Sequence, residues 1–221
     1  MKTAFKIFLL ILVIAMIFLL AVRYKKVAAP TTAPNNQIES QNIAVPNQNP
    51  QTISDFQSPL DRAKERVFKK PFGIYITPAA SPVQPERFQG YHTGTDWEIF
   101  PEEQSSAVPV KAICSGKLIL KKSATGYGGV AVESCELDNK PITVIYGHLK
   151  LGSITAKIND NLNIGDEIGI LGAAYSAETD GERKHLHLGM YRGSAINILG
   201  YVNSKSQLSD WIDACLYLCS N

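Results

Sequence analysis

The hydrophobic and polar positions divide the chain into three stretches with different periodicities. Residues 7–22 are apolar without interruption, residues 27–57 show no apolar periodicity, and from residue 71 onward short apolar runs alternate with turn residues. These patterns predict a hydrophobic helix, an unfolded segment and a set of β-strands, in that order. We therefore expect one folded domain that is preceded by a hydrophobic segment and a tether.

The first stretch predicts a transmembrane anchor within residues 1–26. Its sixteen apolar residues are slightly fewer than the roughly 20 of a spanning helix, and the flanking Lys6 and Arg23 can extend toward the headgroups to close the gap. Basic residues follow the apolar core where a signal peptide has the small residues of a cleavage site, which favours a retained anchor. The alternative is a buried core helix, which here would have no polar face.

The second stretch, residues 27–57, predicts a flexible tether. It is rich in Pro, Asn, Gln and Thr and cannot bury enough apolar surface to offset its ordering entropy. Residues 58–70 then predict a short helix, with Ser58 as its N-cap, Pro59 at the first helical position and Asp61 in the first turn.

The folded domain, residues 58–221, is expected to be mainly β and antiparallel. Its apolar runs are short, rich in β-branched and aromatic residues, and bounded by Gly, Pro, Asn and Asp. Near the end, residues 206–219 have apolar residues at helical spacing and predict one C-terminal helix. The expected strands lie in FGIYIT, AVPVKAICSGKLILKK, GGVAVESCEL, PITVIYGHLKL, EIGILGAA and HLHLGMY.

The charge distribution gives no indication of a nucleic-acid partner. The formal net charge of +2 arises from the N-terminus, where the first 26 residues have five basic groups and no acidic ones. The remaining chain has 17 basic and 20 acidic residues, so it lacks the basic excess of nucleic-acid-binding domains. Basic residues lie on both sides of the apolar segment and lean weakly toward a cytoplasmic domain.

Two pairs of cysteines predict disulfide bonds. Cys114 and Cys135 are equidistant from the centre of an expected hairpin, between Ala124 and Thr125, and in that register they face each other. Two buried free thiols are the alternative. Cys215 and Cys219 are one helical turn apart and form a second candidate pair. Paired cysteines indicate an oxidising compartment.

All four histidines fall in the β-rich part of the chain. His185 and His187 alternate with leucines in RKHLHLGM, and alternate residues of a strand share a face. Two imidazoles on one face indicate a metal site, a catalytic pair or chance. His92 lies four residues before Asp96 in GYHTGTDWEI, and His148 lies in VIYGHLKL.

A histidine, a carboxylate and a second histidine from a distant strand form a common catalytic zinc set, with a fourth position left for water. His92 and Asp96, in a bent extended segment around Gly94, supply two of these groups. Each motif alone is weak evidence, since an isolated His–x–His is often without function and the histidine of YGHL could lie in the core or on the surface. Their joint occurrence predicts a metal site.

In their order along the chain, HTGTD, YGHL and HLHL resemble the motifs of the lysostaphin/LytM-type zinc metallopeptidases. The intervening AVPVKAICSGKLIL, GYGGVAVES and NIGDEIGILG are similar to strands and Gly-rich turns of that family, and the resemblance covers about residues 71–192. It implies a LytM/lysostaphin-like (duplicated-hybrid-motif) domain. It also implies that His92, Asp96 and His187 bind one Zn²⁺ per chain. His185 then matches the general base, and His148 matches a second active-site histidine that orients water or stabilises the tetrahedral intermediate.

Two further residues are candidates for the site. Strand alternation places Tyr146 on the face of His148. Some members of the resembled family hold the oxyanion with a tyrosine upstream of the first ligand, but none lies six residues before His92. Arg87 is a candidate for that role, and a structural or rim arginine is the alternative.

The segment before the last motif departs from the family pattern. A short Ser/Thr–Gly–Pro sequence and His–Leu–His–Phe are usual, whereas YSAETDGERK is longer and charged. Lys184 replaces a small residue or proline, Leu188 replaces phenylalanine, and no glutamate follows. These departures bear on the choice of substrate.

The resemblance implies a zinc endopeptidase that cleaves cross-bridges or stem peptides of bacterial peptidoglycan. A catalytically idle wall-binding or amidase-activating module is the alternative, although such relatives typically lack ligands that are present here. A peptidase of protein substrates is a third reading. A wall substrate and paired cysteines predict an extracytoplasmic domain held at the cytoplasmic membrane by residues 7–22, with the N-terminus inside. The sequence leaves the oligomeric state open.

Overall fold

The computed structural model describes residues 56–66 and 68–219. The predicted anchor and nearly all of the predicted tether lie outside these residues. Within the described part, no helix is both long and apolar enough to cross a membrane. Phe56, near the start of this part, is 6% exposed and packs in the core.

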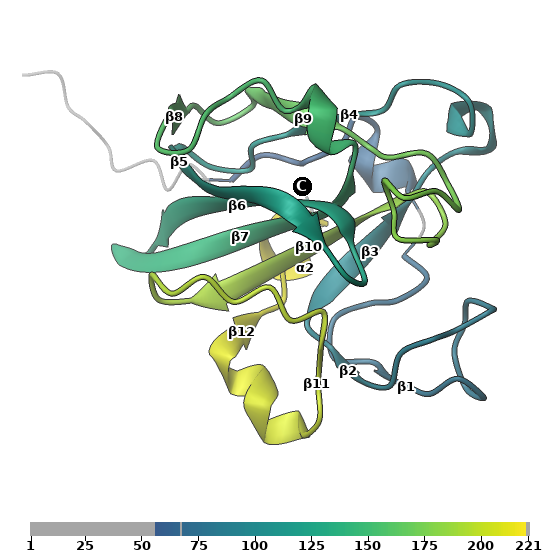
Figure 1. Cartoon of the computed structure of the whole chain (residues 1–221). Helices are drawn as coiled ribbons and strands as arrows, with labels where there is room; N and C mark the ends of the chain where they lie inside the picture. Colours follow the sequence, from purple (N-terminus) through teal and green to yellow (C-terminus); the bar gives the residue numbers. More distant parts are fainter. Residues whose placement is uncertain (1–55, 67, 220–221) are drawn as a thin grey trace, which may run out of the picture. The chain divides into compact units, whose positions relative to one another are not determined.

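A seven-stranded antiparallel sheet forms the centre of the fold (Figure 1). Its strands are β3 (Gly94–Glu98), β5 (Gly116–Ala124), β6 (Gly128–Leu137), β7 (Lys140–Leu149), β8 (Asn161–Leu162), β10 (His185–Arg192) and β12 (Trp211–Ile212). They follow the order β12-β10-β7-β6-β5-β8, and β3 pairs with the edge of β10 that faces away from β7. The prediction of a mainly β, antiparallel domain is confirmed.

Two smaller sheets complete the strand set. The first consists of β1 (Tyr75–Ile76), β2 (Gly90–His92) and β11 (Tyr201–Val202), in the order β1-β2-β11. The second pairs β4 (Pro109–Lys111) with β9 (Glu167–Ile170). In Figure 1 the β4–β9 pair lies above the central sheet and the β1–β2–β11 sheet lies below it.

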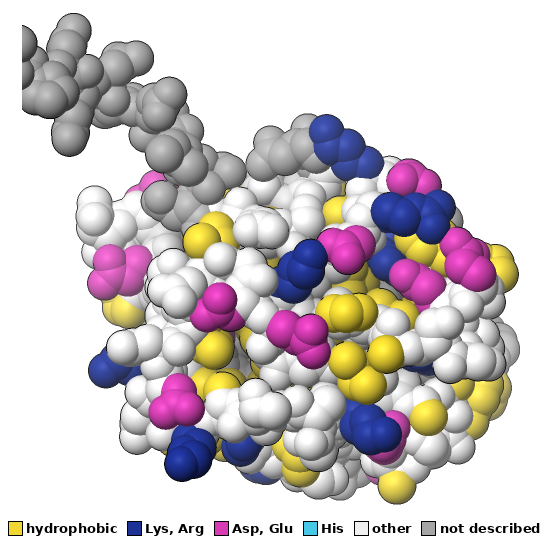
Figure 2. Space-filling view, turned by 90° about the horizontal axis from the view of Figure 1, so that it is seen from above, with side chains coloured by type: hydrophobic (Ala, Val, Ile, Leu, Met, Phe, Trp, Pro, Cys, Tyr) yellow, Lys and Arg dark blue, Asp and Glu magenta, His cyan; other side chains and the backbone are white. Residues whose placement is uncertain are grey.

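The two faces of β10 explain how the core and the histidines are separated. Leu186, Leu188 and Met190 are fully buried in the larger apolar cluster, together with Trp97 of β3. His185 and His187 alternate with them and therefore occupy the other face of the sheet. The face of the molecule drawn in Figure 2 shows no histidine, in line with imidazoles that are at most 5% exposed.

The predicted helix at residues 58–70 is wrong. Among the described residues of this range, the structure has a single 3-10 turn, Ala63–Glu65, and Arg62 before it is left-handed, with φ 56°. The preceding backbone is engaged by another part of the chain, since the Lys111 N–H donates to the Pro59 carbonyl. Leu60 is 2% exposed, so packing beside β4 prevails over the helical propensity of this segment.

The predicted single helix at residues 206–219 is also wrong. A 3-10 helix (Lys205–Asp210), β12 and a one-turn helix α2 (Cys215–Leu218) take its place. Trp211 and Ile212 pair with Tyr191 and Met190 of β10, and their side chains enter different apolar clusters. Such burial on two sides requires an extended backbone. The remaining 3-10 turns described are Pro101–Glu103 and Leu151–Ser153.

Both predicted disulfides are present, Cys114–Cys135 with its Cα atoms 6.2 Å apart and Cys215–Cys219 with its Cα atoms 4.6 Å apart. The predicted hairpin centre is wrong, because Ala124 pairs with Gly128. A register shift lies between Leu118 and Leu120, near the start of β5, and Cys114 precedes that strand. The disulfide therefore joins the open end of the hairpin rather than two directly opposed strand residues.

The core contains a carboxyl group with a perturbed pKa. Glu133 of β6 is fully buried, and its Oε2 accepts a hydrogen bond of 2.7 Å from the Tyr146 hydroxyl. Burial raises the pKa of Glu133 from 4.5 to about 8. The folded state thus holds a proton that the unfolded chain releases near pH 4.5, and the free energy of unfolding falls as the pH rises from about 4.5 to about 8.

We expect Glu133→Gln to remove most of this pH dependence. Glutamine resembles the protonated carboxyl group, so the stability gain over the wild type should be small at pH 4 and grow by up to about 1.4 kcal/mol per pH unit toward pH 8. Urea unfolding at several pH values measures the gain. Glu136→Gln, an exposed position on the same strand, is the matched control. A gain that is independent of pH would contradict the prediction.

Candidate active site

Three side chains meet on the face of the central sheet that carries the histidines of β10. His92 comes from β2, Asp96 from β3 and His187 from β10, where it is paired with Asp96 in the register of the sheet. His92 Nε2, Asp96 Oδ1 and His187 Nδ1 form a triangle with edges of 3.0 Å between the two nitrogens and 3.2 Å from each nitrogen to the oxygen. The structure thus brings together all three predicted metal ligands.

The triangle fits a zinc ion. Ligand atoms about 2.0–2.1 Å from a tetrahedral zinc ion lie roughly 3.3 Å from one another, close to the edges found here. The donors are two imidazole nitrogens and a carboxylate oxygen, a set that zinc accepts in catalytic sites. All three side chains are at most 4% exposed.

Neighbouring groups fix the positions of the two histidine rings of this triangle. His92 Nδ1 lies 3.3 Å from the Pro71 carbonyl oxygen, to which it donates, so that Nε2 presents its lone pair to the triangle. Gly94 makes room for His187, because a Cβ at position 94 would lie 2.8 Å from His187 Nε2. The glycine of His–x–Gly–x–Asp is thus needed for close packing of β3 against the His187 ring.

The electrostatics of the triangle favour metal binding. Burial lowers the pKa of His187 to about 4, so the imidazole is neutral near pH 7. Burial opposes ionisation of Asp96, but His185 and His92 together hold the pKa of this carboxyl group well below its usual range. Neutral imidazole and ionised carboxylate are the protonation states that bind a cation.

His185 lies beside the triangle without belonging to it. Its Nδ1–H donates to the Arg183 carbonyl at 2.9 Å, and its Nε2 lies 3.3 Å from Asp96 Oδ2, the oxygen that does not belong to the triangle. The ring is thereby fixed with Nε2 directed toward the site. A proton that arrives at Nε2 would be stabilised by the Asp96 carboxylate, as a general base requires.

His148 reaches the site through an irregularity of β7. Gly147 and Leu149 pair with consecutive residues of β6, so that His148 is the extra residue of a β-bulge, and its φ is 63°. This conformation is unfavourable for a non-glycine residue and is typically retained for function. The His148 ring lies 4.2 Å from that of His185, and burial together with His185 lowers its pKa well below the usual value.

The bulge also shows that the expected position of Tyr146 is wrong. Tyr146 packs in the core on the opposite face, where its hydroxyl donates to Glu133 and accepts from the Ile113 N–H at 2.9 Å. Simple alternation fails here because the extra residue, His148, reverses the side of the sheet. Tyr146 therefore contributes to the core and not to the site.

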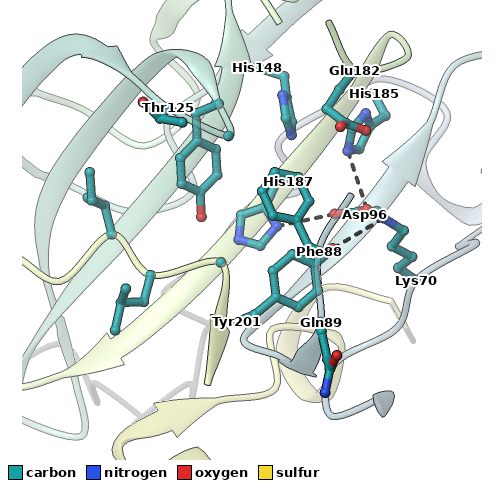
Figure 3. Close-up of a pocket in the computed structure, with 15 residues that line it drawn as sticks. Lys70, Phe88, Gln89, Asp96, Thr125, His148, Glu182, His185, His187 and Tyr201 are labelled. Atoms are coloured by element: carbon teal, nitrogen blue, oxygen red, sulfur yellow. Dashed lines mark hydrogen bonds and ion pairs between the residues drawn. The ribbon is translucent and has the colours of Figure 1, made fainter. Parts of the chain in front are cut away.

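A cavity of about 260 Å³ opens over the three histidines of β7 and β10 (Figure 3). Phe88, Tyr127 and Tyr201 form aromatic walls, and Tyr127 stacks edge-on against His187 with ring centroids 5.2 Å apart. Arg87 does not line this cavity. Its guanidinium binds Glu182 at 2.9 Å and Asp180 at 3.3 Å, which supports the alternative reading of Arg87 as a rim arginine.

Arg183 is the main site residue missing from the sequence-based set. Its side chain is 9% exposed and contacts both Asp96 and Glu98. Its only signal in the sequence was its place in the charged segment before His185, and nothing in that pattern revealed that the side chain turns inward.

Comparisons with known proteins gave one family match and several similar solved structures. Residues 90–198 match the profile of Peptidase family M23, whereas curated protein sequences gave no match. Similar solved structures include the catalytic domain of the antimicrobial peptidase lysostaphin from Staphylococcus simulans, with 20% identity over 70% of this chain and 93% of that chain and a TM-score of 0.48.

Two other solved structures are similar to a comparable degree. LytU is 21% identical over 66% of this chain and 79% of its own, with a TM-score of 0.45. The protein cbpa from L. salivarius REN is 21% identical over 71% of this chain and 95% of its own, with a TM-score of 0.44. The match to peptidase family M23 covers residues 90–198, and this part of the chain, which contains His92, Asp96 and the histidines of β7 and β10, is therefore similar to that family.

Proposed function

We propose that the protein is a zinc metalloendopeptidase that hydrolyses peptide bonds of bacterial peptidoglycan. The observation that carries the proposal is the triangle of His92, Asp96 and His187 atoms, with edges of 3.0–3.2 Å. Asp96 and His187 line one cavity together with His185. The similarity of residues 90–198 to peptidase family M23 supports a peptidase, and the cavity gives an extended peptide access to the histidines.

Each residue of the site has its own role in the proposed hydrolysis. A zinc ion held by the triangle would polarise the peptide carbonyl and acidify a water molecule. His185 Nε2 accepts the proton of the attacking water, and the Asp96 carboxylate stabilises the resulting imidazolium. The buried His148 ring lies 4.2 Å from the His185 ring, measured between ring centroids. It is placed to donate a hydrogen bond to the tetrahedral intermediate. The aromatic walls exclude bulk water, which strengthens these interactions.

Digestion of purified peptidoglycan tests this function directly. The wild type should release new amino and carboxyl termini, which mass spectrometry identifies and thereby assigns to cross-bridges or stem peptides. His185→Ala is the control, because it removes the base and leaves the ligand triangle. An idle wall-binding or amidase-activating module would bind peptidoglycan without releasing termini, and cleavage of protein substrates alone would identify the third alternative.

We also propose that the domain lies outside the cytoplasmic membrane, tethered by residues 7–22. The two disulfides support this location, since such bonds do not persist in a reducing cytoplasm. At roughly 5–6 Å × √n, a thirty-residue tether has an r.m.s. end-to-end distance of about 30 Å, enough to place the active-site cavity away from the membrane and closer to the wall.

Limited proteolysis of cells with permeabilised outer layers tests the location. Externally added protease should release the domain by cutting within residues 27–57. A domain that stays protected until the cytoplasmic membrane is lysed would contradict the proposed location, and with it a peptidoglycan substrate.

A further inference from the structure

Arg183 contacts the site through both its side chain and its backbone. Its Nη2 donates to Asp96 Oδ2 at 3.1 Å, and its carbonyl oxygen accepts the Nδ1–H of His185 at 2.9 Å. One residue therefore touches a predicted metal ligand and the predicted base, although it belongs to neither group.

The contact with Asp96 separates the roles of the two carboxylate oxygens. Oδ1 lies in the triangle, 3.2 Å from each ligand nitrogen. Oδ2 points away from it, accepts from Arg183 Nη2 at 3.1 Å and lies 3.3 Å from His185 Nε2. With Oδ2 engaged by the Arg183 guanidinium, Asp96 offers a cation one oxygen only.

A second carboxylate fixes the guanidinium itself. Glu98, two residues after Asp96 on the same face of β3, accepts from Arg183 Nε at 3.0 Å and also from Nη2. The Arg183 and Glu98 side chains are 9% and 11% exposed. Glu98 compensates the arginine charge in this nearly dry environment, so that Arg183 can approach Asp96 without a net positive charge beside the metal position.

We propose that Arg183 is a positioning residue that restricts Asp96 to a single metal-binding oxygen and holds His185 beside it. This inference rests on the proposed zinc site and explains the charged segment that precedes the last motif. Partners in contact with ligands typically change metal affinity by about 10–100-fold when they are removed.

The test measures zinc affinity by competition with a chelator and the visible spectrum of the cobalt-substituted protein. Arg183→Met alone leaves the nearly buried Glu98 with only the Lys69 ammonium, 3.9 Å away, to compensate its charge. The decisive variant is therefore Arg183→Met combined with Glu98→Gln, which removes both charges. We expect zinc to bind about 10–100-fold more weakly. The cobalt absorption should also lose intensity, because Asp96 can then bind through both oxygens and raise the coordination number. Arg183→Lys keeps the positive charge but cannot reproduce the several hydrogen bonds of the planar guanidinium, so it should recover only part of the zinc affinity.

Arg66 provides a matched control. Its side chain is 1% exposed and likewise donates two hydrogen bonds to one carboxylate, each 2.8 Å long and to Glu103, but it does not contact Asp96. Arg66→Met should therefore retain the zinc affinity and cobalt spectrum of the wild type.

Wild-type affinity and an unchanged cobalt spectrum in the folded double variant would overturn the proposal. A wild type that binds zinc but releases no peptidoglycan fragments would refute the proposed function and leave the role of Arg183 intact. A wild type that binds no zinc would refute both.

Discussion

His187→Ala is expected to abolish stoichiometric zinc binding and, with it, peptide hydrolysis. The change removes one corner of a triangle in which His187 Nδ1 lies 3.0 Å from His92 Nε2 and 3.2 Å from Asp96 Oδ1. A structural zinc ion contributes roughly 10–16 kcal/mol over four ligands, so that one ligand corresponds on average to about 2.5–4 kcal/mol, which is about 10²–10³-fold in affinity. Metal analysis after dialysis against a weak chelator measures the loss.

Equivalent losses are expected for His92→Ala and Asp96→Ala. His148→Ala is the control, since its ring lies in the same cavity but contributes no atom to the triangle. One equivalent of zinc in purified His187→Ala would show that the metal is held elsewhere and would refute the ligand assignment.

For His185→Ala we expect the opposite combination, full zinc occupancy with turnover reduced about 10²–10⁴-fold, the usual contribution of a general base. His185 contacts the oxygen of Asp96 that points away from the triangle, so its removal leaves the three ligand atoms in place. Zinc content and kcat are measured on the same preparation, with KM determined separately to exclude a loss of substrate binding.

The two histidines of the His–x–His motif thus provide a reciprocal test. If His185→Ala lost the metal while His187→Ala kept it, the two assignments would be interchanged. If both variants kept zinc and full turnover, the motif would have no part in the chemistry.

The shared face of His185 and His187 could be predicted from the sequence because it depends on regular strand geometry, whereas the choice of His92, Asp96 and His187 as ligands followed from the family resemblance. Alternation along β10 places His185 and His187 opposite Leu186 and Leu188, and the structure has these side chains on the faces that a period of two requires. The same rule gave the antiparallel strands, whose apolar residues build the core.

Predictions failed where the backbone departs from that rule. The bulge at His148 moved Tyr146 to the opposite face, and pairing of Trp211 with β10 interrupted an apparently helical apolar pattern. Arg183 escaped prediction for another reason. Its burial depends on Glu98, a residue 85 positions away, and local patterns contain no information about such a partner.

The central position of β10 has a consequence for the dynamics of the site. Residues 187–189 are paired with β3 on one edge and with β7 on the other, and Leu188 between them is fully buried. Amide hydrogens in such a strand exchange with solvent only when the whole domain unfolds, whereas those of surface loops exchange through small local openings. We therefore expect the predicted ligand His187 to lie among the most slowly exchanging residues, so that loss of the metal-binding geometry on heating should coincide with global unfolding instead of preceding it.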